Sequence, residues 1–437
     1  MPNCTTSLMN FSPLGRKKIT ASFTGGSITS DGGLLLLREI DKELGLTHSI
    51  AKCIKDKRNQ SYVDHKAKDI IRQRVYALAA GYEDLNDHDI LRKDISFQTM
   101  VSRDSELASS ATLSRFENMV THNDCVALSK LLVEEFIASF KVAPRELILD
   151  FDPTDFTLYG NQEDSHYHGY YQDFCYLPLY VYCGEQVLAA YLRPSNIDGS
   201  KHGGALLKLL VKRLRQAWPN VLIRFRCDGA FARRHILAWC ERNNIEYLVG
   251  LSRNSRIEKS LREQLEYAQK EYETTHAKQK LFTELSYQAG TWHKARRVVA
   301  KVEYNHHGSN LRLVVTNMNN FAQDLYENNY CLRGNMENYI KQQKLDLRAD
   351  RVSAHTFVAN QFRVLLVAFA YILINKLRDK YLKGTALAKA YCGTIRNKLL
   401  KIGAIVIKNT RKIKFLFSDS FVNQDLFTVI AKKIEAG

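Results

Sequence analysis

The spacing of hydrophobic residues along the chain changes near residue 144. Before this point, several runs place apolar residues three or four positions apart, as amphipathic helices do. These runs cover residues 34–44, 66–80 and 128–140, after a strand-like opening at 18–23. From residue 146 the apolar positions become dense and rich in aliphatic and aromatic side chains, which is typical of buried strands. We therefore expect a mostly helical N-terminal region followed by a sheet-containing region.

The sheet-containing region begins with three expected strands and continues with alternating helices and strands. The expected strands are 146–152, 175–183, 186–192, 221–227 and 246–251, and the expected helices are 203–217 and 231–243. Elements in this order predict an α/β fold, a mixed sheet with helices packed against it.

Residues 252–329 interrupt this pattern. A charged amphipathic helix at 257–273 precedes two strand-like runs, 297–304 and 311–316, which a short polar turn joins as in a hairpin. Helical spacing then returns through residue 377, and a basic segment follows at 392–417. We expect five regions: a mostly helical region at 1–143, the first part of a core at 144–251, an insertion at 252–329, the final core helices at 330–377, and a basic helical region at 378–437.

The charge of the chain points to a polyanionic partner. Its 63 Lys and Arg residues outnumber 46 Asp and Glu residues, which gives a formal net charge of +17. A positive field of this size favours nucleic acid. We therefore expect the helical region at 1–143 to bind DNA, although no single recognition helix stands out. The basic positions Lys408, Arg411, Lys412 and Lys414 suit either solvent or the DNA backbone.

The cysteines and the apolar runs indicate a reduced, cytoplasmic protein with no membrane partner. Nine cysteines are scattered without a Cys-x-x-Cys pair, which argues against a zinc module. Residues 1–20 contain cations but no apolar segment of a secretory signal. The longest apolar run, 364–374, is too short to span a bilayer and predicts a buried helix.

Three carboxylates stand at positions suited to catalysis. Asp152 and Asp228 each end an expected strand, where open sheets place their ligands, and Glu337 lies on a later helix. At about 100° per residue, an ideal helix brings a stripe of residues within roughly 80° of arc. The stripe consists of Tyr330, Arg333, Glu337, Lys341 and Lys344. A carboxylate flanked by cations suits a divalent metal held against a phosphodiester.

Most of these residues also have a structural interpretation. Asp152 and Asp228 could cap the turns that follow their strands, because Asp is favoured there. Arg333 and Lys341 could be i,i+4 partners of Glu337.

The glycine-rich segment 25–33 could hold a phosphate at a helix start or form a capped turn, and its lack of a Lys-Ser/Thr ending favours the turn.

Two acids at the ends of the first and fourth expected strands, followed by an acid on a helix beyond an insertion, resemble the layout of an RNase H-like nuclease core. The spacing of Tyr330, Arg333, Glu337 and Lys344 matches the Tyr-x2-Arg-x3-Glu-x6-Lys signature of one superfamily of DDE transposases. Segments at 161–163, 168–171, 177–180 and 193–198 are similar to the thirteen-eighty family of bacterial insertion-sequence transposases. This resemblance runs over nearly the whole chain.

The resemblance implies a DNA transposase that cuts at terminal inverted repeats and joins the 3′-hydroxyl ends to target DNA. It assigns metal binding and catalysis to Asp152, Asp228 and Glu337, and DNA contacts to the four other stripe residues, Tyr330, Arg333, Lys341 and Lys344. It implies two Mg²⁺ ions per site, with Mn²⁺ able to substitute, and a homodimer on paired double-stranded DNA ends. The setting would be the bacterial cytoplasm, at the nucleoid.

Several alternatives stay open at this stage. Asp150 and Asp155 flank the first acid, although the pattern Asp152-Pro153-Thr154 favours Asp152. Trp292 is the candidate for the tryptophan that stacks on a flipped base in hairpin-forming relatives, but it precedes the expected hairpin strands. The function could also be that of an RNase H-like nuclease without strand transfer, or of an inactive DNA-binding derivative.

Overall fold

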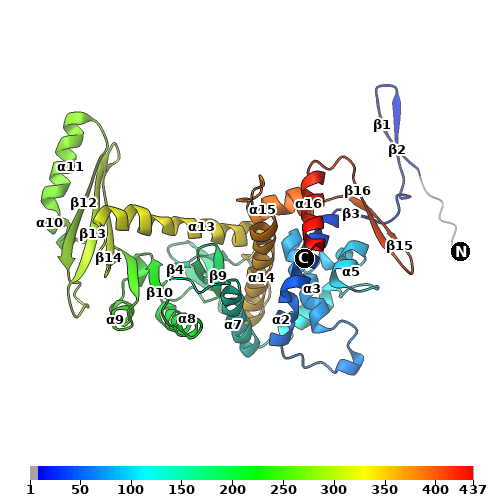
Figure 1. Ribbon diagram of the computed structural model, residues 1–437, viewed down its shortest axis with the longest axis horizontal. Helices are drawn as coiled ribbons and strands as arrows, with labels where there is room; N and C mark the ends of the chain where they lie inside the picture. Colours follow the sequence, from blue (N-terminus) through cyan, green and yellow to red (C-terminus); the bar gives the residue numbers. More distant parts are fainter. Residues whose placement is uncertain (1–7, 437) are drawn as a thin grey trace. The chain divides into compact units, whose positions relative to one another are not determined.

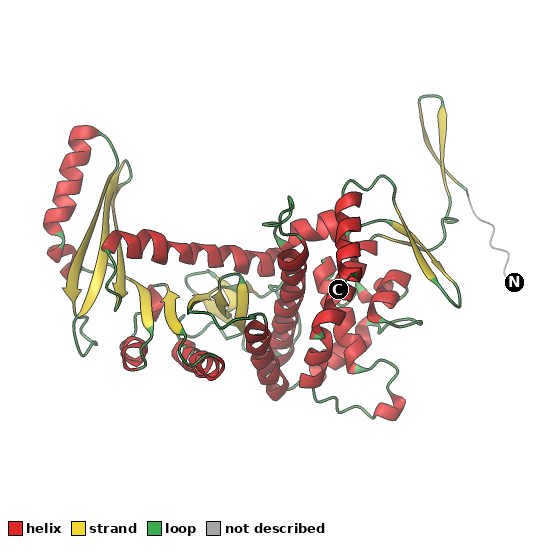
Figure 2. Ribbon diagram, in the orientation of Figure 1, coloured by secondary structure: helices red, strands yellow, loops and turns green. Residues whose placement is uncertain are grey.

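The computed structural model describes residues 8–436, which form two compact units. Of the described residues, the first unit comprises 8–119, 346–348 and 369–436, and the second comprises 120–345 and 349–368. Each unit is described separately below. Figure 1 follows the chain by colour, and Figure 2 separates helices from strands.

The second unit is built on an eight-stranded mixed sheet with the order β12-β13-β14-β11-β10-β4-β8-β9. Its strands are β4 (Glu146–Pro153), β8 (Leu179–Cys183), β9 (Gln186–Tyr191), β10 (Leu222–Cys227), β11 (Glu246–Leu251), β12 (Gln279–Tyr287), β13 (Arg296–Asn305) and β14 (Gly308–Thr316). Strands β4, β10 and β11 run parallel, and the other neighbours pair antiparallel. The mixed α/β fold expected from the sequence is confirmed.

The expected insertion extends this sheet. Strands β13 and β14 form the expected hairpin, and β14 pairs with β11 of the core. The sequence interpretation missed β12, which pairs with β13 along its whole length and becomes the edge of the sheet. Helices α10 (Ser255–Ser260) and α11 (Arg262–Thr275) belong to the same segment.

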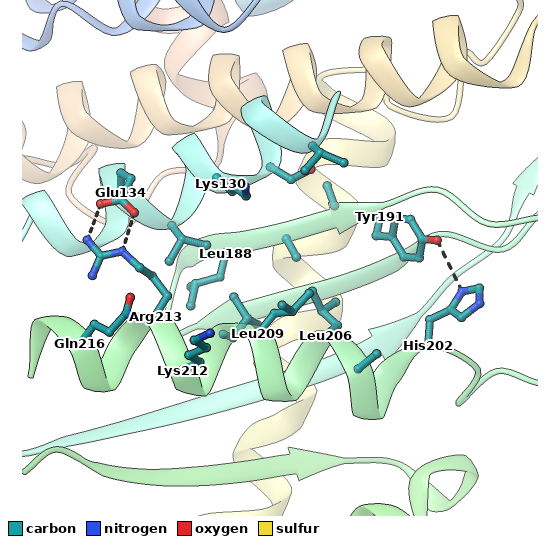
Figure 3. A pocket seen from close by; sticks show the side chains of 17 residues that line it. Lys130, Glu134, Leu188, Tyr191, His202, Leu206, Leu209, Lys212, Arg213 and Gln216 are labelled. Atoms are coloured by element: carbon teal, nitrogen blue, oxygen red, sulfur yellow. Dashed lines mark hydrogen bonds and ion pairs between the residues drawn. The ribbon is translucent and has the colours of Figure 1, made fainter. Parts of the chain in front are cut away.

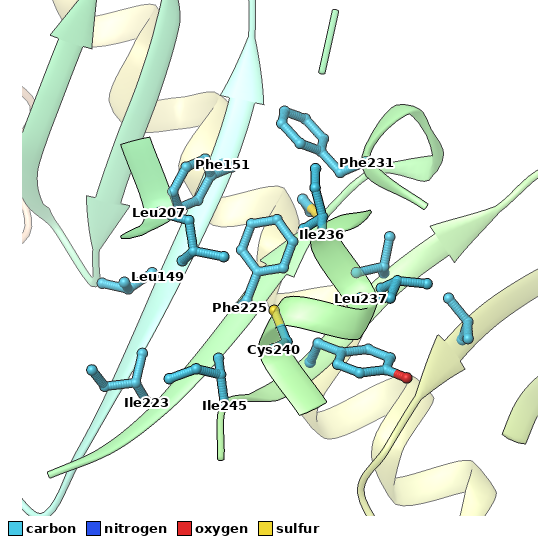
Figure 4. Packing of buried hydrophobic residues seen from close by; sticks show 14 of the residues in the cluster. Leu149, Phe151, Leu207, Ile223, Phe225, Phe231, Ile236, Leu237, Cys240 and Ile245 are labelled. Carbon is cyan, nitrogen blue, oxygen red and sulfur yellow. The ribbon is translucent and has the colours of Figure 1, made fainter. Parts of the chain in front are cut away.

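The main hydrophobic core lies on one face of the sheet. Because side chains alternate along a strand, Leu147, Leu149 and Phe151 of β4 point into this core, together with Phe225 of β10. Helices α7 (His122–Ala138), α8 (Gly203–Ala217) and α9 (Arg234–Arg242) supply the opposing side chains. Figure 4 shows Phe151, Phe225 and Phe231 meeting edge to face in this cluster.

The opposite face of the sheet is covered by a long helical segment, residues 322–346. Leu325 and Tyr326 pack there against Leu248, Val299 and Val314 of the sheet. The segment changes its winding along its length. It runs through α12 (Ala322–Asp324), a π-helical turn η4 (Leu325–Tyr330), a 3-10 turn η5 (Cys331–Arg333), α13 (Gly334–Lys341) and a second π-helical turn η6 (Gln342–Asp346). The regular helix assumed for the stripe is therefore wrong in detail.

A small three-stranded sheet, ordered β5-β7-β6, completes the strands of the second unit. It consists of β5 (Phe156–Thr157), β6 (His166–His168) and β7 (Asp173–Tyr176). Helix α14 (Phe357–Tyr381) begins in this unit and ends in the first. By length and composition α14 could cross a membrane, but 78% of its most apolar 18-residue window is buried, as in a core helix.

The first unit is mostly helical, as expected for the N-terminal region. Its helices before residue 120 are η1 (Gly32–Leu34), α1 (Leu35–Leu44), α2 (Leu46–Cys53), η2 (Gln60–Tyr62), α3 (Ala67–Ala80), α4 (His88–Leu91), α5 (Ile95–Val101) and α6 (Ser110–Met119). The C-terminal part adds α15 (Cys392–Ile395), η7 (Arg396–Leu400) and α16 (Gln424–Glu435).

Two small sheets belong to this unit. Strands β1 (Met9–Leu14) and β2 (Lys17–Ala21) pair with each other, while β15 (Ala404–Lys408) pairs with β16 (Ile413–Phe417) and with β3 (Ile28–Thr29). The C-terminal region, expected to be helical, therefore also contains two strands, and one of them, β15, pairs with β3 from the N-terminal part.

The glycine-rich segment 25–33 has a packing role. A Cβ atom on Gly33 would lie 2.0 Å from the carbonyl oxygen of Leu399, so only glycine allows this approach. Glycine at position 32 is similarly crowded by Phe417 and Ile402. The structure thus accounts for these glycines by close backbone packing. The eight cysteines in residues 8–436 form no disulfide bond, and Cys4 lies outside the described residues.

Candidate active site

Asp152 lies at the end of β4, on the face of the sheet opposite the main core. Its side chain is 15% exposed. Burial raises the pKa of Asp152 to about 7; Arg333 opposes the shift, while Asp228, Glu337 and Asp150 add to it. The carboxyl group therefore stands in a field of other carboxylates and is readily protonated in the absence of a further cation.

Asp228 directly follows β10, the parallel neighbour of β4. Its Oδ1 accepts a hydrogen bond of 2.9 Å from the backbone N–H of Ala230 and caps the short turn η3 (Gly229–Phe231). Burial raises the pKa of Asp228, although this hydrogen bond and Arg333 act in the opposite direction. The capping interpretation is thus realised, and the same carboxylate still contributes to the charge around Asp152.

Arg333 connects the carboxylates. Its guanidinium donates to Asp152 Oδ1 at 3.2 Å and lies 3.8 Å from Glu337 Oε1. Burial lowers the pKa of Arg333. The electrostatic effect of Asp152, Tyr330, Asp228 and Glu337 outweighs burial, so the pKa of Arg333 lies above its ordinary value. One part-buried cation, with a side chain that is 20% exposed, therefore lies in the field of three acids that come from two strands and a helix.

The helical stripe divides into two parts. Tyr330, Arg333 and Glu337 lie near Asp152 and Asp228, although the winding changes from π to 3-10 to α between them. The Glu337 side chain is 53% exposed. Lys344 instead binds Asp155, with its Nζ 2.8 Å from the backbone oxygen and 3.1 Å from Oδ1. Lys341 is exposed, and within residues 8–436 no hydrogen bond or ion pair holds its side chain.

The two alternatives to Asp152 have cationic partners of their own. Asp150 forms a buried, two-pronged pair with Arg226, at 2.5 Å from Nε to Oδ1 and 2.7 Å from Nη2 to Oδ2. The Arg226 guanidinium also donates to the backbone oxygen of Asn329 and so ties β10 to the helical segment. Asp155 is held by Lys344. Both flanking acids thus pair with cations other than Arg333, which pairs with Asp152.

A polar groove of about 610 Å³ opens beside Asp228 and Arg333. Tyr330 forms part of its wall, with its ring 5.8 Å from that of Tyr326. Arg253 and Arg312 line the groove as well, and sequence reasoning missed both. Arg253 follows β11 two residues after the strand ends, so the strand-end argument that selected Asp228 would also have found it.

The side chains of this site have the oxygen donors that a divalent cation needs, but they are not close enough together to hold one in this arrangement. Asp152, Asp228 and Glu337 offer the hard oxygen donors that Mg²⁺ prefers. Within residues 8–436, however, no three His, Cys, Asp or Glu side chains are grouped closely enough to hold a metal ion. In this arrangement the Arg333 guanidinium supplies the positive charge between Asp152 and Glu337.

Several nearby residues have partners other than the three carboxylates and Arg333, although Asp198 adds to the negative charge around Asp228. Trp292 is buried, 4% exposed, with the Arg296 guanidinium 4.9 Å from its ring centre, so its ring is not free to stack on a base. Asp198 pairs with Arg233 at 2.6 Å. His166 and His168 belong to the small sheet, where they flank Tyr167 on β6 and take part in no metal-holding group of the described residues.

An apolar cavity of about 520 Å³ lies elsewhere in the second unit, between α7, α8 and β9. Figure 3 shows Leu188, Leu206 and Leu209 along it, with the Glu134–Arg213 pair at one end. None of the three carboxylates of the site lines this cavity.

A family model matches almost the whole chain. No curated protein matches the chain. Among solved structures, a cryo-EM structure titled as the piggyBac transposase synaptic complex with hairpin DNA matches with 10% sequence identity and a TM-score of 0.40, covering 93% of this chain and 82% of that chain. The family model described as transposase DDE domain group 1 matches residues 11–436. The chain therefore belongs to this family of DDE transposases.

Proposed function

We propose that this transposase cuts DNA at the terminal inverted repeats of an insertion sequence and joins the freed 3′-hydroxyl ends to target DNA. The observation that carries the proposal is the convergence of Asp152, Asp228 and Glu337 on Arg333, in a chain whose family match extends from residue 11 to residue 436. A purely structural salt bridge between Arg333 and Asp152 would not require a second acid on the neighbouring parallel strand and a third on the helix.

The sheet supports a narrower assignment of the fold. The order β9-β8-β4-β10-β11, with β4, β10 and β11 parallel, is the arrangement expected of an RNase H-like core. We assign this core to residues 144–251 and 330–377, with residues 252–329 as its insertion. DNA binding is assigned to residues 1–143, and 378–437 is the basic C-terminal region. Within the DDE transposases, we propose membership of the thirteen-eighty family.

Asp152, Asp228 and Glu337 are the residues that would hold two Mg²⁺ ions, or Mn²⁺ in their place. Such ions, when bound, activate the attacking oxygen and stabilise the leaving oxygen of a phosphodiester. Asp152 would give up its proton on binding a cation, because its raised pKa reflects burial among other carboxylates. The Arg333 guanidinium, once released from Asp152, would bind a phosphate oxygen beside the scissile bond.

The remaining stripe residues would position the DNA. Lys341 carries an exposed ammonium group suited to a backbone phosphate. Lys344 lies beside Asp155, next to the end of β4, and from there it would contact the DNA. The Tyr330 ring forms part of the groove wall, where a nucleotide could pack against it.

A strand-transfer assay on DNA carrying the ends of the element tests the proposal. Asp152→Asn, Asp228→Asn and Glu337→Gln should each abolish cleavage and joining while duplex binding is retained. Glu327→Gln is the matched control, because Glu327 lies on the same helical segment but pairs with Lys280. Cleavage without joining would favour the nuclease alternative, and DNA binding without any cleavage by the wild-type protein would favour an inactive derivative.

The proposed function also bears on the oligomeric state and the cellular location of the protein. Joining two element ends in one event requires two sites, so we propose a homodimer on paired DNA ends. Light scattering of the protein with and without end DNA would measure this state. We propose that the protein acts on double-stranded DNA in the bacterial cytoplasm.

A further inference from the structure

The N-terminal hairpin of the first unit is a ribbon of two strands. Met9 lies opposite Ala21, Asn10 opposite Thr20, Phe11 opposite Ile19, and Leu14 opposite Lys17. Within residues 8–436, neither β1 nor β2 pairs with a further strand. The ribbon is the blue hairpin in Figure 1.

The ribbon exposes large apolar side chains. Opposed residues in an antiparallel pair share a face, and the face alternates along each strand. Phe11 and Ile19 therefore lie together on one face, and they are 57% and 42% exposed. Leu14, at the turn, is 72% exposed. An isolated two-stranded hairpin is at best marginally stable in water, and exposed apolar groups gain free energy when they are covered. The ribbon thus has the properties of a binding element whose partner is absent.

The charge of this segment identifies the partner. Residues 8–30 contain Arg16, Lys17 and Lys18 and neither Asp nor Glu. No ion pair or hydrogen bond holds these three side chains within the part of the chain that the structure describes. Three free cations at the turn of a ribbon, with no acid nearby, complement a phosphate backbone.

The shape of the ribbon agrees with DNA. The grooves of duplex DNA admit a two-stranded β-ribbon, and DNA-binding ribbons and arms place apolar side chains against or between bases while cations contact phosphates. Pro13 and Leu14 stand directly before the cations at the turn. A protein partner would account for the apolar face but would leave the unpaired charge without a role.

We propose that the β1–β2 ribbon binds duplex DNA, with Arg16, Lys17 and Lys18 on backbone phosphates and Phe11 and Leu14 against the bases. The inference rests on the proposed function in that DNA is the substrate. It assigns a contact surface outside the carboxylate site, and its test does not depend on catalysis.

The charge is tested by measuring the affinity for a fluorescein-labelled duplex across 50–200 mM salt, with EDTA present to prevent cleavage. The Arg16→Ala/Lys17→Ala/Lys18→Ala variant should lower the log–log salt slope by about 2 to 3, because each lost phosphate contact removes about 0.9. The matched control is Lys398→Ala/Lys432→Ala/Lys433→Ala, three exposed cations of the same unit. An equal change in slope from both triple variants would overturn the proposal.

The apolar side chains are tested in the Phe11→Ser/Leu14→Ser variant. It should lose about tenfold in affinity, the scale of one or two base contacts, while its salt slope stays unchanged. Sedimentation of the same variant detects the competing partner, a second copy of this chain. A shift from dimer to monomer with unaltered DNA affinity would overturn the proposal. Failure of the wild-type protein to bind any duplex would instead remove the proposed function itself and, with it, this inference.

Discussion

The Arg333 guanidinium donates to Asp152 Oδ1 at 3.2 Å and reaches Glu337 Oε1 at 3.8 Å, one helical turn along its own segment. The residue that the sequence associates with DNA thus also serves as counter-ion to two of the proposed metal ligands. For Arg333 to bind a DNA phosphate as proposed, its hydrogen bond to Asp152 would have to open.

Arg333→Ala should weaken cleavage and the complex with end DNA more than it lowers the melting temperature. Loss of the guanidinium removes a charge-assisted phosphate contact of roughly 1.5 to 3 kcal/mol. The fold should survive, because burial would leave Asp152 protonated. Cleavage rate and melting temperature, measured on the same preparation, decide between the roles. A variant that melts several degrees lower yet cuts normally would assign Arg333 to structure alone.

Asp152→Asn should raise the melting temperature at pH 8 in EDTA and have little effect at pH 4. The pKa of Asp152 rises from 3.8 in the unfolded chain to about 7 in the fold, so the fold favours the protonated acid. Stability from this group is complete below pH 4 and is lost as the pH rises through 7. Asparagine cannot ionise, so the Asp152→Asn variant does not lose this stability at high pH. Each kcal/mol corresponds to roughly 2–4 °C in a unit of this size.

Glu327→Gln serves again as the control in this series, since its carboxylate is paired with Lys280 on the surface. A pH-independent difference between Asp152→Asn and the wild-type protein would show that Asp152 keeps an ordinary pKa.

Asp150→Asn should destabilise the second unit by about 3–5 kcal/mol, because it leaves Arg226 buried without its counter-charge. Asp155→Asn, which breaks a more exposed pair with Lys344, should cost far less. Chemical denaturation measures both. If Asp150→Asn keeps full stability but loses all cleavage, Asp150 is the first catalytic acid and our assignment of Asp152 is wrong.

Gly33→Ala should prevent stable folding of the first unit, because the added methyl group would meet the Leu399 carbonyl oxygen at 2.0 Å and the Leu400 Cα at 2.8 Å. Gly403→Ala is the control, since nothing lies within 4 Å of the added atom. Circular dichroism on heating compares them. A folded Gly33→Ala variant that loses DNA affinity would revive the phosphate-binding interpretation of this glycine-rich turn.

The sequence by itself determined the core strands and the order of the candidate acids. Strands such as β4 and β10 are short apolar runs bounded by turn residues, and their alternation places Asp150 and Asp152 on the face opposite Leu149 and Phe151 without any tertiary information. The spacing of Arg333 and Glu337 likewise predicted their contact, because residues four apart on a helix are neighbours.

Only the tertiary structure decided what each acid pairs with and where the insertion goes. Asp150 meets Arg226 across two strands that are 76 residues apart in sequence, and Asp155 meets Lys344 across 189. Strand β12 has mixed polar and apolar positions, because an edge strand is only partly covered, so its pattern alone did not mark it as a strand. The winding of residues 322–346 depends on packing against the sheet, and burial of Trp292 depends on Arg296 and Tyr287. Pairings of this kind arise from chain segments that meet only in the folded protein, and local sequence patterns carry no record of them.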